Sequence, residues 1–94
     1  MIADELDEGL KACPVPAYMH APLRRYVIDH LEVGSFLTAV LANDLFSAVT
    51  RADDQNSKAL VNWVRLVYSY LPAKCSGSPH AVSEWLKESE QENE

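Results

Sequence analysis

Cysteine, glycine and basic charge are all scarce in this chain of 94 residues. It holds two cysteines, three glycines, and eight Lys and Arg against fourteen Asp and Glu. Duplex nucleic acids are bound by neutralising their phosphates, so the lack of a basic stripe argues against a duplex-binding protein. The glycines are isolated and form no phosphate-binding loop. No apolar run is long enough to span a membrane, so we expect no membrane partner.

The two cysteines, Cys13 and Cys75, predict neither a disulfide framework nor a metal site. No set of His, Cys, Asp or Glu has the spacing of a structural zinc site, and we expect no metal and no cofactor. The acidic N-terminus lacks the basic and apolar regions of a signal peptide, which favours a cytoplasmic protein with reduced thiols. Whether the two cysteines lie close together is left open by the sequence.

The net charge of −6 comes from the two ends of the chain. Residues 1–11 hold four acidic residues and one lysine, and residues 87–94 again hold four and one. Apolar residues make up 48% of the sequence, which is a normal share for a globular protein. We therefore predict a single domain with an ordered core at about 12–87 and flexible acidic ends at 1–11 and 88–94.

Helical periodicity predicts an all-α fold. We expect a small bundle of about four helices around a central hairpin, whose two helices run over about 35–51 and 54–71. Asp53 or Asp54 caps the second helix of the hairpin. A helix at about 22–31 precedes the hairpin, and a short helix that begins at Pro79, with Ser78 as its N-cap and Trp85 as its apolar anchor, follows it. No segment has the pattern of a strand.

Asn43 and Asp44 interrupt the longest apolar stretch. In a straight helix Asp44 would lie among Leu37, Val40 and Leu41, where a carboxylate is either paired or marks a break. Helical spacing continues on both sides, so we favour a continuous or kinked helix. The alternative is two short helices, with Asn43 or Asp44 capping the second.

The helix predicted over 54–71 is apolar on almost its whole circumference. A helix with so little polar surface is buried on several sides, and a domain this small has few other helices to cover it. Exposed apolar patches usually meet another chain. We therefore expect a homo-oligomer, most simply a two-fold dimer, joined through this helix.

A group of polar residues gathers around the predicted hairpin and supports two interpretations. It forms either a hydrogen-bonded network that fixes the turn, or the polar wall of a pocket that aromatic residues complete. Amide and guanidinium groups beside aromatic rings suit a planar ligand that carries phosphate. The candidate ligand-binding residues are Asn43, Asp44, Arg51, Asp53, Asn56, Arg65 and Tyr68. No nucleophile–base pair is apparent, so we predict no catalytic residue and no enzyme.

The stretch GSFLTAVLANDL at 34–45, followed by Arg51-Ala52-Asp53 and Asn56, resembles a group of short proteins encoded by tailed bacteriophages and prophages. The resemblance resumes at Tyr68, Pro72, Cys75, Gly77-Ser78-Pro79 and Trp85, and it covers about residues 20–86. It brings no established activity. It implies a small accessory protein that acts stoichiometrically, either by blocking a host enzyme or by holding a defence signal.

Together these features predict a non-enzymatic counter-defence protein of the host cytoplasm. It would bind and sequester a small anionic ligand such as a nucleotide immune signal. The alternative is a protein-binding inhibitor of a host or defence enzyme, acting through apolar surface and the acidic tails. Few basic residues are available to meet phosphates, so an oligomer would have to double them by symmetry.

Overall fold

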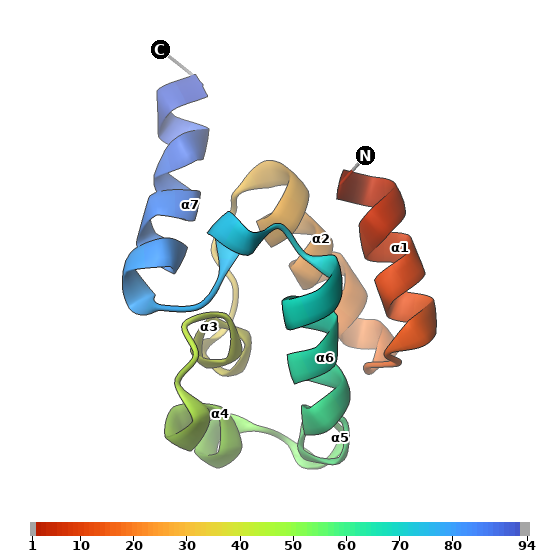
Figure 1. The fold of residues 1–94 in the computed structure, drawn as a ribbon. Coiled ribbons are helices and arrows are strands. Elements are labelled where there is room, and N and C mark those ends of the chain that lie inside the picture. The colour runs from red at the N-terminus through yellow and green to blue at the C-terminus, as the bar shows by residue number, and fades with distance from the viewer. Residues whose placement is uncertain (1, 93–94) are drawn as a thin grey trace.

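The computed structural model describes residues 2–92, and for 89–92 the backbone alone. Every regular element in this part of the chain is helical (Figure 1). The α-helices are α1 (Ile2–Ala12), α2 (His20–Asp29), α3 (Ser35–Leu41), α4 (Leu45–Arg51), α5 (Asp54–Lys58), α6 (Leu60–Tyr70) and α7 (Pro79–Glu92), and the 3-10 helices are η1 (Ala17–Met19) and η2 (Ala73–Cys75). The predicted all-α class is confirmed, and the helices are shorter and more numerous than predicted.

The first long helix of the predicted hairpin is in fact two helices, α3 and α4, so the preference for a continuous helix was wrong. Asn43 has a left-handed backbone with φ of 62°. Its N–H donates to the carbonyl of Val40 at 3.1 Å, and the N–H of Asp44 donates to the carbonyl of Ala39 at 2.8 Å. These two bonds form the Schellman ending of a helix. Asp44 then caps α4 by accepting the N–H of Ser47 at 3.2 Å.

The second predicted helix is also divided, at Ala59, into α5 and α6. Asp53 is the N-cap of α5, as the sequence led us to expect of Asp53 or Asp54, and its carboxylate accepts the N–H of Asn56 at 2.7 Å. The helix α3 packs against both α4 and α6, so it stands between the two halves of the predicted hairpin. In place of the predicted two-helix hairpin, the central unit consists of the four successive helices α3, α4, α5 and α6.

The helix α1 corrects the expectation that residues 1–11 lie outside the ordered core. It packs on α6 and α2, and its Leu6 side chain is fully buried. Gly9 allows the close approach, because a Cβ atom there would lie 2.6 Å from Leu66 Cδ1 and 2.7 Å from Tyr70 Cβ. The acidic residues of α1 thus occupy the outer face of a helix whose apolar side joins the core.

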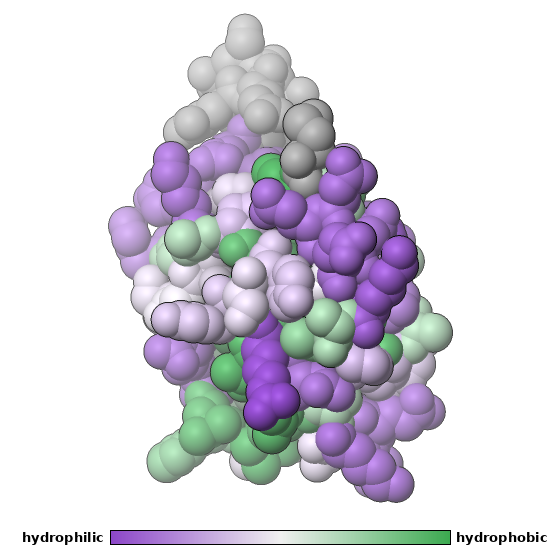
Figure 2. Space-filling view, turned by 45° about the vertical axis from the view of Figure 1, so that its right-hand side comes forward, coloured by the Kyte–Doolittle hydropathy of each residue, from purple (hydrophilic) through white to green (hydrophobic). Residues whose placement is uncertain are grey.

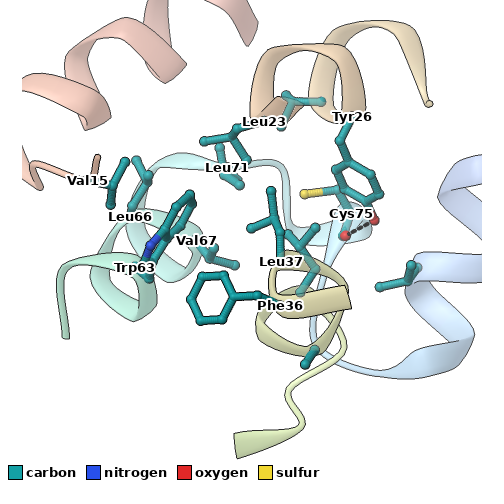
Figure 3. Packing of buried hydrophobic residues seen from close by; sticks show 14 of the residues in the cluster. Val15, Leu23, Tyr26, Phe36, Leu37, Trp63, Leu66, Val67, Leu71 and Cys75 are labelled. Atoms are coloured by element: carbon teal, nitrogen blue, oxygen red, sulfur yellow. Dashed lines mark hydrogen bonds between the residues drawn. The ribbon is translucent and has the colours of Figure 1, made fainter. Parts of the chain in front are cut away.

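The core lies between α2, α3 and α6, with Trp63 and Tyr26 as its largest fully buried side chains (Figure 3). The Tyr26 hydroxyl donates to the carbonyl of Cys75 at 2.6 Å, and Trp85 Nε1 donates to the carbonyl of Tyr26 at 2.7 Å. Both cysteines are buried and free. The polar atoms of the Tyr26 and Trp85 rings thus find backbone partners, which offsets the cost of burying them.

The last helix, α7, begins at Pro79 as predicted. Ser78 Oγ accepts the N–H of Ala81 at 3.0 Å, and Trp85 anchors the helix to α2. The expected flexible end at 88–94 falls partly on the backbone of α7, and residues 93–94 lie outside the described part of the chain. None of the described helices combines the length and the apolar character needed to cross a membrane.

Candidate functional site

A cavity of about 320 Å³ opens between α3, α6 and the loop that precedes α7. This size is at the lower end of the range for small-molecule sites, roughly 300–1,000 Å³. Its walls are mostly apolar. The lining residues are Val40, Asn43, Val64, Val67, Tyr68, Ser76 and Gly77.

Asn43 and Tyr68 are the two residues of the predicted site that line this cavity. The left-handed backbone of Asn43 ends α3, and asparagine tolerates that conformation better than most residues. Tyr68 lies on α6 and is 89% exposed, so its ring is a free surface. The C-terminal ends of α3 and α6, which are far apart in sequence, thus place the Asn43 amide and the Tyr68 ring at the same cavity.

The third wall is the loop at Ser76 and Gly77. Gly77 has φ of +113°, a conformation that side chains rarely adopt, and its N–H donates to the carbonyl of Leu41 at 2.8 Å. This bond satisfies a carbonyl at the end of α3 that the helix itself leaves open. The loop is thereby fixed against α3, and Ser76 is held at the cavity wall.

Exposed apolar side chains lie on α4 and on α6. We call this set the apolar face, and its members are Leu45, Phe46, Val49, Val61, Val64 and Tyr68. Leu45 of α4 and Val64 of α6 line one shallow groove, and Val64 and Tyr68 line the cavity beside it. Figure 2 shows hydrophobic surface at the lower left of the molecule, where Figure 1 places α4.

The charges near this site are few. None of the residues that line the cavity is basic or acidic. Arg65 lies three residues before Tyr68 on α6 and is exposed, so the two side chains are neighbours on the helix surface. Asp44 lines the adjoining groove, and its pKa is held below the usual value by hydrogen bonds from Ser47. The cavity is thus uncharged, with the Arg65 cation beside it.

Asp53 and Asn56 belong to an internal network. Asn56 is 3% exposed, and its side-chain oxygen accepts the Nε1–H of Trp63 at 3.0 Å. Asp53 accepts the hydroxyl of Tyr18 and the N–H of Asn56, and these bonds lower the pKa of its carboxyl group. The interpretation of these two residues as a network that fixes the turn therefore describes their contacts.

Arg51 lies exposed at the end of α4 and does not line the cavity. The structure thus divides the seven predicted residues into four groups. Asn43 and Tyr68 line the cavity, Arg65 lies three residues before Tyr68 on α6, Asp44 caps α4, and the remaining three lie at or near the turn before α5.

Cys75 immediately precedes the loop wall of the cavity. Burial raises the pKa of the Cys75 thiol to about 11, which keeps it protonated and unreactive near neutral pH. Its carbonyl is already bonded to Tyr26. Among the described residues, no group of three or more His, Cys, Asp and Glu could hold a metal ion.

Sequence reasoning missed the valine walls of the cavity and the loop residues Ser76 and Gly77. The valines Val40, Val64 and Val67 have the pattern of ordinary helix core, because periodicity does not separate a buried side chain from one beside a cavity. The motif at Gly77 was visible, but its contact with α3 depends on tertiary packing.

The chain matches no protein-family model, and neither the curated proteins nor the solved structures provide a match. Function is therefore inferred from the geometry of this site.

Proposed function

We propose that this protein is a non-enzymatic binder that sequesters a small planar ligand, with a nucleotide immune signal as the leading candidate. The observation that carries the proposal is that Asn43 and Tyr68 line one cavity. Asn43 carries an amide and Tyr68 an aromatic ring, and the two groups together suit a nucleobase. This role agrees with the stoichiometric action that the resemblance to small phage proteins implies.

The chemistry of the walls suits a base. The Tyr68 ring offers a face for stacking, which for base–aromatic pairs contributes about 1–3 kcal/mol. The Asn43 amide carries a donor and an acceptor for the edge of the base, and Ser76 adds a hydroxyl group. The valines supply the apolar area that small-molecule sites share.

The phosphates of such a ligand would lie outside the cavity, because its walls carry no cation. Arg65 is the basic side chain beside Tyr68, and a guanidinium group binds phosphate through paired hydrogen bonds. One cation per protomer is a weak phosphate site. The proposal therefore places the base in the cavity and the phosphates at the rim, where Arg65 meets them.

Calorimetric titration with a panel of linear and cyclic nucleotides tests the proposal. Tyr68→Ala removes the stacking face, and Asn43→Gly removes the amide while keeping a residue that tolerates the left-handed backbone. We expect each variant to weaken binding by at least about tenfold. Ile28→Ala, on the exposed side of α2, is the control.

Arginine variants separate the two guanidinium groups. Arg65→Ala should weaken binding and reduce its dependence on salt, whereas Arg51→Ala should leave both unchanged because Arg51 does not line the cavity. Equal affinities for the wild type, Tyr68→Ala and Asn43→Gly would refute the proposal.

A second function, inhibition of a partner protein, is supported by the exposure of Phe46. Phe46 is 84% exposed on α4, and aromatic residues of this kind are typical anchors of protein interfaces. Under this alternative, Phe46→Asp abolishes inhibition of the target enzyme and Tyr68→Ala has a smaller effect. Deleting residues 87–94 would also weaken inhibition if the acidic tail contributes.

A further inference from the structure

We propose that the apolar face is covered by a second copy of this chain, and that the two faces meet about a two-fold axis. The six side chains of the face are each at least half exposed. They present on the order of 700 Å² of accessible surface, close to the ~800 Å² that each partner contributes to a standard interface. The largest apolar patch of a typical monomer is smaller, roughly 300–600 Å².

The distribution of charge favours a second copy over an acidic or basic partner. No residue of the face is charged, and the charged residues that flank the groove and Tyr68 have opposite signs: Asp44 in the groove and Arg65 next to Tyr68. Two copies that meet here bring no like-charged cluster together. Electrostatic complementarity of this kind permits association without a dedicated partner.

The excess of acidic residues lies away from this face. The net charge of −6 arises from residues 1–11 and 87–94, and of these the structure places 2–11 in α1 and 87–92 at the end of α7. Figure 1 places α1 and the end of α7 at the upper end of the molecule, whereas α4 lies at the lower end. Repulsion between two such protomers is therefore distant from the contact and is reduced further by screening at physiological salt.

The shape of the face also suits pairing with itself. Phe46, Leu45 and Val49 project from α4, and a groove lined by Leu45 and Val64 separates them from α6. Ridges on one copy can fill the groove of the other, and a two-fold axis makes each contact twice. The same residues then serve as both projection and groove.

The second copy would also complete the ligand cavity, and this part of the inference depends on the proposed function. Small-molecule sites bury about 70–90% of a drug-sized ligand. A base stacked on Tyr68, which is 89% exposed, would keep its other face in water. A partner protomer on the apolar face closes this open side.

Sedimentation velocity over a range of protein concentrations tests the pairing without any ligand. We expect the wild type to be a dimer, or a larger assembly that contains this contact. Phe46→Asp should raise the dissociation constant at least ~30-fold, the loss expected for an interface hot spot. Val61→Asp, on the α6 side, should act in the same direction, while Ile28→Asp on α2 should leave association unchanged.

Circular dichroism checks that each variant is folded, and since all three positions are exposed we expect native spectra. A wild type that stays monomeric at a protein concentration of about 100 µM would overturn the pairing. So would association that Ile28→Asp disrupts and Phe46→Asp leaves intact. An oligomer that survives deletion of residues 87–94 supports the proposal, because the apolar face remains.

The same variants separate this inference from the proposed function. If Phe46→Asp is monomeric and binds the nucleotide panel at least about tenfold more weakly, the partner completes the site. If the monomeric variant binds with unchanged affinity, the completion of the cavity is wrong and the proposed function stands. If Asn43→Gly forms normal dimers that bind like the wild type, the proposed function fails and the pairing stands.

Discussion

The buried core and the exposed surface of α4 and α6 differ in how their aromatic side chains are placed. In the core, the rings of Tyr26, Trp63 and Trp85 are buried and their polar atoms are hydrogen-bonded. On the exposed surface of α4 and α6, Phe46 and Tyr68 are more than four-fifths exposed. A domain this small can bury few of its apolar residues, so exposed aromatic side chains on these two helices indicate a binding surface.

Helix length explains part of this difference. The helices α1 and α6 have eleven residues each and pack along one another, whereas α3 and α4 have seven. A helix of two turns has room for only a few contacts with its neighbours and presents the rest of its side chains to solvent. The break at Asn43 therefore shapes the cavity and also leaves α4 exposed.

The largest effect on stability should come from a substitution in the buried core. Trp63→Ala removes a fully buried ring and leaves the side-chain oxygen of Asn56 without its donor, so we expect a loss of about 3–5 kcal/mol in unfolding free energy. Val61→Ala, two residues earlier and exposed, should change stability by less than about 0.5 kcal/mol in the monomeric state. Urea denaturation measures both, and equal losses would contradict the division between a buried core and an exposed surface.

A smaller loss should follow from adding one methyl group at Gly9. Gly9→Ala places a Cβ 2.7 Å from Tyr70 Cβ, so α1 must shift away from α6 at a cost of about 1–3 kcal/mol. Gly34→Ala is the control, because a Cβ there meets nothing within 4 Å. Thermal unfolding compares the two variants. A stability for Gly9→Ala equal to that of Gly34→Ala would show that α1 is not tightly packed.

The break between α3 and α4 should respond to capping chemistry. Asp44→Ala removes the cap of α4 and should cost about 0.5–2 kcal/mol. Asn43→Gly should be nearly neutral, because glycine adopts the left-handed conformation freely. Chemical denaturation distinguishes these cases, and a destabilised Asn43→Gly variant would show that the amide itself supports the fold.

The smallest expected effect concerns reactivity and not stability. Burial raises the pKa of the Cys75 thiol from 9.0 to about 11, so at pH 8 its thiolate fraction falls roughly 100-fold. In a Cys13→Ser background, we expect DTNB to label Cys75 slowly in the native protein and rapidly after unfolding in about 6 M guanidinium. Rapid labelling of the native protein would mean that the core around Cys75 opens readily.

Sequence patterns predicted the all-helical class, the capping roles of Asp53 and Ser78, and the anchor at Trp85. They failed at Asn43 and Gly9, where a single residue decides where a helix ends or how closely two helices pack. The apolar spacing around Asn43 fits one long helix, yet the Schellman bonds and the cap at Asp44 end it. Likewise Gly9 in an acidic segment gives no sign that α6 lies against it, since that contact is tertiary.

The candidate site was predictable only in part, for the same reason. An amide and an aromatic ring could be selected by chemistry, and Asn43 and Tyr68 do share a cavity. Asp53 and Asn56 have equally suitable groups, but their partners are Tyr18 and Trp63. The sequence does not reveal which polar groups the fold has already satisfied.

Native mass spectrometry of the wild type, alone and with the nucleotide panel, tests the central claim that the exposed side is a binding surface. We predict an oligomer that retains a nucleotide, with Asn43→Gly forming the same oligomer and retaining less of the ligand. A wild-type monomer that retains no nucleotide would contradict this claim.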